Sequence, residues 1–152
     1  MRLLVLNGPN LNLLGIRQPE IYGQTSYSDL TNSLKKWANE YAVDLDIFQS
    51  NHEGALVDKI QNAYQKVDGI VINPAAYTHT SIAIRDALAA VAIPFVEVHL
   101  SSISQRESYR QVSYIQDLAL ITIEGQGPAG YLQALDFIKN YLFNPNNPSP
   151  IT

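Results

Sequence analysis

A glutamate and a histidine two positions apart, Glu97 and His99, have the spacing of an acid catalyst and the group that orients it. On an extended strand, residues i and i+2 point to the same side of the sheet. A carboxylate beside an imidazole fixes the tautomer of the ring and favours its protonated form, as a general acid requires. The same pair would also suit a structural histidine, and the spacing alone leaves both interpretations open.

A second pair, Arg17 and Tyr22, lies in a polar stretch and could supply a base. A phenol has a pKa of about 10 and is almost fully protonated at neutral pH. A nearby guanidinium lowers the pKa of the phenol and increases the phenolate fraction. Tyr22 would then be able to remove a proton from carbon, with Arg110 as a candidate for a second positive group beside it. Each side chain taken alone would be an ordinary solvated loop residue, and the pair gains chemical meaning only together.

Polar residues follow three short aliphatic runs, which end just before Asn7, Asn73 and Glu97. Runs of this kind, each followed by a helical pattern, are typical of parallel strands buried on both faces. In a parallel sheet the ligand crevice lies beyond the carboxyl ends of the strands. The polar residues are therefore expected to line one crevice. His79 should lie there too, and its N–H could hold an anionic or hydroxylated ligand.

The predicted fold class is α/β, a three-layer doubly wound fold around a five-stranded parallel sheet of order 2-1-3-4-5. The strands are expected at residues 2–7, 44–49, 69–73, 94–99 and 118–123. Helices are expected to begin at an S-x-x-D cap in residues 26–29, at a capping box in residues 50–53, near residue 80 and at Pro128. The last helix should bury Leu132, Leu135, Ile138 and Leu142.

Length and composition indicate one ordinary domain. The 152 residues predict a single domain over 1–143 and a flexible, proline-containing tail over 144–152. A net charge of −4 argues against nonspecific binding to nucleic acid or to anionic membranes. The chain has no cysteine, no secretory signal pattern and no apolar run long enough to span a membrane. A cytoplasmic location is therefore expected.

The expected helix over residues 80–91 is apolar nearly all round, with Arg85 and Asp86 as its charged interruptions. A helix with apolar residues on every side is buried on more than the face that covers its own sheet. We therefore expect this helix to pack against another subunit.

Two cofactor interpretations are weaker. The segment G-Q-G-P-A-G (residues 125–130) matches a dinucleotide fingerprint, but it opens the last helix and lacks a following strand and a ribose-binding acid. The segment after the first strand lacks the hydroxyl residues that a flavin phosphate would need. The three histidines have no metal-site spacing, so neither a metal nor a cofactor is expected. A flavodoxin-like nucleotide- or flavin-binding module stays the second hypothesis.

Taken together, the motifs resemble those of type II 3-dehydroquinate dehydratase, a small flavodoxin-like enzyme. They include N-G-P-N-L-N-L-L-G (residues 7–15), R-Q-P-E-I-Y-G (17–23), Q-S-N-H-E-G (49–54), N-P-A-A-Y-T-H-T-S (73–81), R-D (85–86), E-V-H-L-S (97–101), R-E (106–107) and S-Y (113–114). The resemblance spans residues 1 to about 142, with the motifs in order and at compatible spacing.

The resemblance implies trans elimination of water from 3-dehydroquinate in the shikimate pathway, through an enolate and without a cofactor. Its catalytic residues would be Tyr22 as the base, Arg17 supporting the phenolate, Asn12 steadying the enolate through a water, and His99 as the acid oriented by Glu97. Substrate would be held by Asn73, His79, Arg110, Asp86 from a neighbouring subunit, and the backbone N–H groups of Leu100 and Ser101. The family assembles as dodecamers of four trimers.

The chain departs from the family pattern at four positions: Ala75, Ser102, Gln111 and Val112. An alanine at position 75 would be strained if that residue has a positive φ. None of the four removes a group with an assigned chemical role, but together they motivate a third hypothesis, an inactive homologue.

Overall fold

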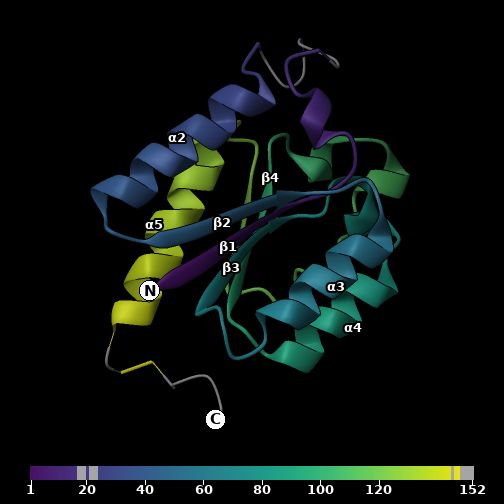
Figure 1. The fold of residues 1–152 in the computed structure, drawn as a ribbon. Helices are drawn as coiled ribbons and strands as arrows, with labels where there is room; N and C mark the ends of the chain where they lie inside the picture. Colours follow the sequence, from purple (N-terminus) through teal and green to yellow (C-terminus); the bar gives the residue numbers. More distant parts are fainter. Residues whose placement is uncertain (17–19, 21–23, 145, 148–152) are drawn as a thin grey trace.

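The computed structural model describes residues 1–16, 20, 24–144 and 146–147, so Arg17 and Tyr22 lie outside the described residues. The predicted fold class and strand order are confirmed. Five parallel strands form one sheet in the order β2-β1-β3-β4-β5 (Figure 1). The strands are β1 (Arg2–Asn7), β2 (Asp44–Gln49), β3 (Gly69–Asn73), β4 (Phe95–His99) and β5 (Thr122–Glu124).

Helices cover both faces of the sheet. Figure 1 shows α2 (Tyr27–Glu40) and α5 (Ala129–Phe143) on one side, and α3 (Glu53–Ala63) and α4 (Ile82–Val91) on the other. Short 3₁₀ helices follow the strands: η1 (Leu11–Leu13), η2 (Ala75–His79), η3 (Ile103–Gln105) and η4 (Ser108–Arg110). Among the described residues, no helix is long and apolar enough to cross a membrane.

The interior of the central strand β1, residues 3–6, is apolar because both of its faces are covered. Leu3 and Val5 point into the core beneath α2 and α5, whereas Leu4 and Leu6 point into the core beneath α3 and α4. All four side chains are almost fully buried, because successive residues of a strand face opposite sides and both sides are covered. A strand buried in this way has no position for a polar side chain until its end.

Amides occupy that end. Asn7 is the last residue of β1, and it pairs in register with Gln49 of β2 and with Asn73 of β3. Three neighbouring parallel strands therefore deliver three amide side chains to one edge of the sheet. The edge where these amides meet is the one at which the sequence predicts the crevice.

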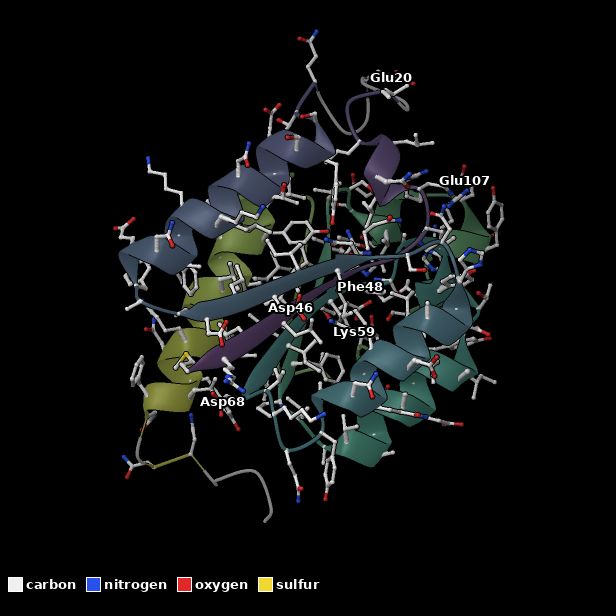
Figure 2. All side chains as sticks on the ribbon, in the orientation of Figure 1. Glu20, Asp46, Phe48, Lys59, Asp68 and Glu107 are labelled. Carbon is white, nitrogen blue, oxygen red and sulfur yellow. The ribbon has the colours of Figure 1, made fainter. Side chains whose placement is uncertain are left out.

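The edge strand β2 carries a charged contact with α3. Figure 2 shows Lys59 of α3 beside Asp46 and Phe48 of β2. The Lys59 Nζ lies 2.6 Å from an Asp46 carboxylate oxygen and 5.2 Å from the centre of the Phe48 ring. Charged side chains of this kind protect an edge strand from pairing with other chains.

The helix starts were predicted with mixed success. The S-x-x-D cap is confirmed, since Ser26 and Asp29 form a reciprocal capping box at the start of α2. The capping box in residues 50–53 is wrong: α3 begins after His52 without a side-chain cap, and the Ser50 hydroxyl instead accepts from the His52 N–H. A polar cluster before a helix can satisfy a loop as well as a cap.

Two further boundaries differ from expectation. The last strand covers Thr122–Glu124 and not 118–123. Residues 118–120 form a turn and bends, and the Leu120 N–H donates to the Phe95 carbonyl where the chain joins β4. The helix expected from residue 80 begins at Ile82, with Ser81 capping the N–H of Ile84. Pro128 immediately precedes α5.

The end of α4 allows one test of backbone strain. Ala92 has a φ of 53°, a left-handed conformation that disfavours residues with a Cβ. Ala92→Gly should therefore raise the free energy of unfolding by about 1 kcal/mol. The control Ala90→Gly, within the helix, should lower it by about 1 kcal/mol. Urea unfolding at one protein concentration measures both, and two shifts of the same sign would contradict the argument.

Candidate active site

A cavity of about 270 Å³ opens at the carboxyl ends of the strands, where the sequence placed the crevice. Its wall comes from the segments after β1, β3 and β4, the three strands whose polar ends were singled out. The lining residues are Pro9, Asn10, Leu11, Leu14, Asn73, Ala75, Ala76, His79, His99, Leu100, Ser101, Ile103, Arg106 and Arg110.

Most of the predicted site residues that the structure describes meet at this cavity. Six of them line it: Asn73, His79, His99, Leu100, Ser101 and Arg110. Glu97 lies directly behind His99. Two others do not line it. Asn12 is exposed in η1 and accepts a hydrogen bond from Gln49, and Asp86 is exposed on α4. Arg17 and Tyr22 are outside the described residues.

The pair on β4 has the geometry expected from its spacing. Glu97 and His99 point the same way from the strand, and the His99 Nε2–H donates to a Glu97 carboxylate oxygen at 2.6 Å. A carboxylate can only accept when ionised, so Nε2 carries a proton and Nδ1 is the nitrogen left for a ligand. Both side chains are buried, which protects the pair from water.

Hydroxyl groups hold the Glu97 carboxylate from its other sides. Thr78 donates to Glu97 at 2.8 Å, Ser113 at 2.7 Å and Thr122 at 3.3 Å. Burial alone would raise the pKa of Glu97, but the hydrogen bonds and charge of His99, together with the Ser113 and Thr78 hydroxyls, bring this pKa below its ordinary value. The carboxylate is therefore ionised in its buried position. Sequence reasoning missed these hydroxyls, which lie far apart along the chain.

His79 is held by a neutral group. Its Nδ1–H donates to the Val112 carbonyl at 2.7 Å, so the ring N–H expected to bind a ligand is already used. Burial lowers the pKa of His79, and the nearby charges of His99 and Arg110 lower it further, outweighing the Val112 hydrogen bond and Glu97. The neutral ring is left with Nε2 as an acceptor. A ligand hydroxyl matches this acceptor better than an anion does.

The loops after β1 and β3 approach closely at the cavity. The Gly8 N–H donates to the Asn73 carbonyl at 2.8 Å. A Cβ on Gly8 would lie 2.1 Å from the Pro74 carbonyl oxygen, so this contact requires glycine. Ala75, on the same wall, has a φ of 54°. The strain predicted for an alanine at this position is thus present, and it sits beside Asn73.

Two arginines form the cationic side of the cavity, and sequence reasoning gave a role to only one of them. Arg110 Nε lies 3.1 Å from a Glu107 carboxylate oxygen but makes no hydrogen bond within the described structure, although it is buried. Arg106 donates to the Ser101 hydroxyl at 3.1 Å. Figure 2 labels Glu107, which precedes the short helix that ends at Arg110. The signals for Arg106 were its place in the polar segment after β4 and its R-E motif (106–107), to which no role was given.

The glycine-rich segment before α5 does not have the role of a dinucleotide fingerprint. Gly125 and Gly127 have φ values of 75° and 57°, which are turn conformations. The N–H of Gly127 is donated to the Leu100 carbonyl at 3.0 Å and is not free to bind a phosphate. These glycines shape the turn into the helix.

The structure is that of a parallel α/β protein with a buried glutamate–histidine pair at the carboxyl end of β4. The chain belongs to the class II dehydroquinase family, whose family model matches residues 1–139. It is 59% identical over 136 residues to 3-dehydroquinate dehydratase 1 of Ralstonia nicotianae, covering 89% of this chain and 87% of that protein. It is 56% identical over 133 residues to the catabolic 3-dehydroquinase of Talaromyces marneffei, covering 88% of this chain and 76% of that protein.

The fold agrees with this membership. The crystal structure of type II dehydroquinase from Butyrivibrio crossotus superimposes with a TM-score of 0.90 at 49% sequence identity, covering 91% of this chain and 97% of that one. The resemblance inferred from the motifs is therefore confirmed at the level of the family and of the fold.

The buried carboxylate makes stability depend on pH. Because the pKa of Glu97 is lower in the folded protein, its contribution is complete above the ordinary value of 4.5 and is lost as the pH falls below it. Glu97→Gln should lower the free energy of unfolding by about 1–3 kcal/mol at neutral pH, since an amide cannot accept from all these donors. The difference from wild type should shrink as the pH falls below 4.5, because the lowered pKa of Glu97 makes the loss begin there.

Chemical denaturation at several pH values and one protein concentration measures this difference. Glu40→Gln, on the exposed side of α2, is the matched control and should change stability by less than about 0.5 kcal/mol. A difference between wild type and Glu97→Gln that stays constant over the pH range would contradict the assignment.

Proposed function

We propose that this protein is a type II 3-dehydroquinate dehydratase, a hydro-lyase that eliminates water from 3-dehydroquinate in trans to give 3-dehydroshikimate through an enolate. Family membership supports the substrate. The observation that carries the chemistry is the Glu97–His99 pair, because an imidazole on the cavity wall backed by a buried carboxylate is suited to protonate a leaving hydroxyl.

The acid half of the mechanism follows from the hydrogen bonds. With Nε2–H committed to Glu97, the acid is the imidazolium, and its Nδ1–H faces the ligand. Transfer of that proton to the C1 hydroxyl converts it to water as the C1–O bond breaks. The ring is left as the neutral Nε2–H tautomer. The ionised Glu97 stabilises the cation before transfer and retains the ring orientation afterwards.

The base half is assigned to Tyr22 with Arg17. The phenolate takes the C2 proton, the C–H electron pair forms the enolate, and its collapse expels the C1 oxygen as His99 protonates it. Asn12, through a water, would steady the enolate oxygen. Arg110 supplies a positive charge on the cavity wall, which favours both the phenolate and an anionic substrate.

Substrate binding uses the remaining wall. His79 offers an acceptor to a substrate hydroxyl, and Asn73 offers an amide. The Arg110 guanidinium, whose Nε lies 3.1 Å from a Glu107 carboxylate oxygen, suits a substrate oxygen through its remaining N–H groups. The carboxylate would bind to the backbone N–H groups of Leu100 and Ser101. Asp86, exposed on α4, would reach the site of a neighbouring subunit in a dodecamer, and the enzyme would work in the cytoplasm without a cofactor.

Three of the four departures from the family pattern, at positions 75, 111 and 112, are compatible with activity. Val112 holds His79 through its backbone carbonyl, so a change of side chain leaves that bond in place. Gln111 donates to the Arg106 carbonyl at 2.7 Å and thereby supports a cavity arginine. Ala75 keeps the backbone conformation that a glycine would adopt without strain. These contacts argue against the inactive homologue.

The deciding experiment adds 3-dehydroquinate to the purified protein and follows the ultraviolet absorbance of the conjugated enone product. We expect the absorbance to rise at a rate proportional to protein concentration. The same protein should show no thermal shift with FMN or NAD. No absorbance rise would refute the dehydratase, and a shift with either nucleotide would favour the binding module.

Tyr22→Phe tests the base. Removing the hydroxyl should lower kcat by at least about 100-fold, the low end for a general base, without loss of the fold. Tyr64→Phe is a matched control, because this tyrosine is 54% exposed after α3 and away from the cavity, so kcat should not change. Circular dichroism checks both folds. Near-normal turnover by Tyr22→Phe would remove the assignment.

A further inference from the structure

A tyrosine that the proposed mechanism does not use lies behind the cavity wall. Tyr131 belongs to α5 and is fully buried. Its hydroxyl reaches the carboxyl ends of β1 and β3, where it donates to the Asn7 side-chain oxygen at 2.7 Å and accepts from the Asn73 side-chain nitrogen at 3.0 Å. One hydroxyl therefore joins two strand-end amides, and one of these amides lines the cavity.

The donor and acceptor in each hydrogen bond of this series follow from the Ala75 backbone N–H at one end. The Ala75 backbone N–H can only donate, and it donates to the Asn73 Oδ1 at 3.1 Å. Asn73 must then turn its Nδ2 toward Tyr131, so the tyrosine oxygen accepts. The single hydroxyl proton of Tyr131 is thus left for Asn7, which presents its oxygen and turns its Nδ2 toward the hydroxyl of Tyr27 at 3.3 Å.

The Tyr131 hydroxyl keeps its proton. Burial raises the pKa of Tyr131 far above its ordinary value, and the hydrogen bond from Asn73 offsets only part of that effect. A neutral phenol can donate one hydrogen bond, here to Asn7, and accept another, here from Asn73, so it matches both amides. No ionisation near neutral pH disturbs the arrangement.

We propose that Tyr131 is a positioning residue that fixes the Asn73 amide, so that the second Nδ2–H of Asn73 is presented to a substrate hydroxyl in the cavity. This inference rests on the proposed function. Oδ1 is held by Ala75 and one Nδ2–H is held by Tyr131, so the second Nδ2–H is the donor left for a ligand. Asn73 is only 3% exposed, and its amide is held on both sides.

Tyr131→Phe tests the proposal by removing the hydroxyl while keeping the ring. Asn73 then loses one of its two supports, and KM for 3-dehydroquinate should rise about tenfold, the effect of one weakened hydrogen bond. The value of kcat should change less than about threefold, because neither the acid nor the base is touched. Tyr141→Phe, on the same helix, is the matched control and should leave both constants unchanged.

A double-mutant cycle with Asn73→Ala separates positioning from general damage. If Tyr131 acts through Asn73, Tyr131→Phe should have no further effect on KM once Asn73 is alanine. Multiplicative effects of the two substitutions would overturn the proposal. So would a fall in kcat with KM unchanged.

Two further measurements keep the result interpretable. Should Tyr131→Phe unfold, Asn7→Ala tests the same series of hydrogen bonds. Without the Asn7 oxygen, the Tyr131 hydroxyl loses its acceptor and can rotate. KM should then rise only while Asn73 is present. Wild-type turnover is measured in the same assay. No wild-type turnover would refute the proposed function, whereas normal turnover with multiplicative effects refutes only the role of Tyr131.

Discussion

The site depends on holding one negative charge out of water. Glu97 is completely buried, and a buried carboxylate without partners would be protonated or would destabilise the fold. The structure supplies an imidazole from β4, a hydroxyl from the segment after β3, and hydroxyls from the segment that leads into β5, whose first residue is Thr122. These donors come from three different parts of the chain. Glu97 therefore stays ionised only when the whole carboxyl edge of the sheet is correctly packed, and the proposed acid chemistry depends on that packing.

That edge is held together by close backbone approach as well as by polar side chains. Gly8 packs against Pro74 at a distance that admits no Cβ, and Asn7 and Asn73 lie side by side in register. Tyr131 closes the arrangement from α5, some 60 residues after Asn73 in the sequence. The cavity wall is thus built from main-chain contacts and directed amides, which leaves little freedom for its polar groups to reorient.

Periodicity predicted the strands, because a buried strand has a local apolar pattern. General rules for parallel α/β sheets then predicted the strand order and the edge at which polar residues meet. They did not predict the partners of Glu97, the closing role of Tyr131 or the position of β5. The apolar spacing of the last helix predicted Leu132, Leu135, Ile138 and Leu142 as its core face. Leu135 and Ile138 are fully buried, Leu132 and Leu142 are partly buried against the core, and Tyr131 and Ala134, which the spacing did not predict, are fully buried. A buried tyrosine is polar at one end, and nothing local shows which distant amides satisfy it.

The two cavity histidines show how position assigns chemical role. Both use one ring nitrogen to donate to an oxygen of the protein: His99 to the Glu97 carboxylate, His79 to the Val112 carbonyl. The carboxylate carries a full negative charge and stabilises an imidazolium, whereas a carbonyl carries only a dipole. His79 also faces the positive charges of His99 and Arg110, which lower its pKa further. In the proposed mechanism one residue type thus supplies a proton donor and a neutral acceptor in the same cavity, and the difference lies in the partners that the fold places behind each ring.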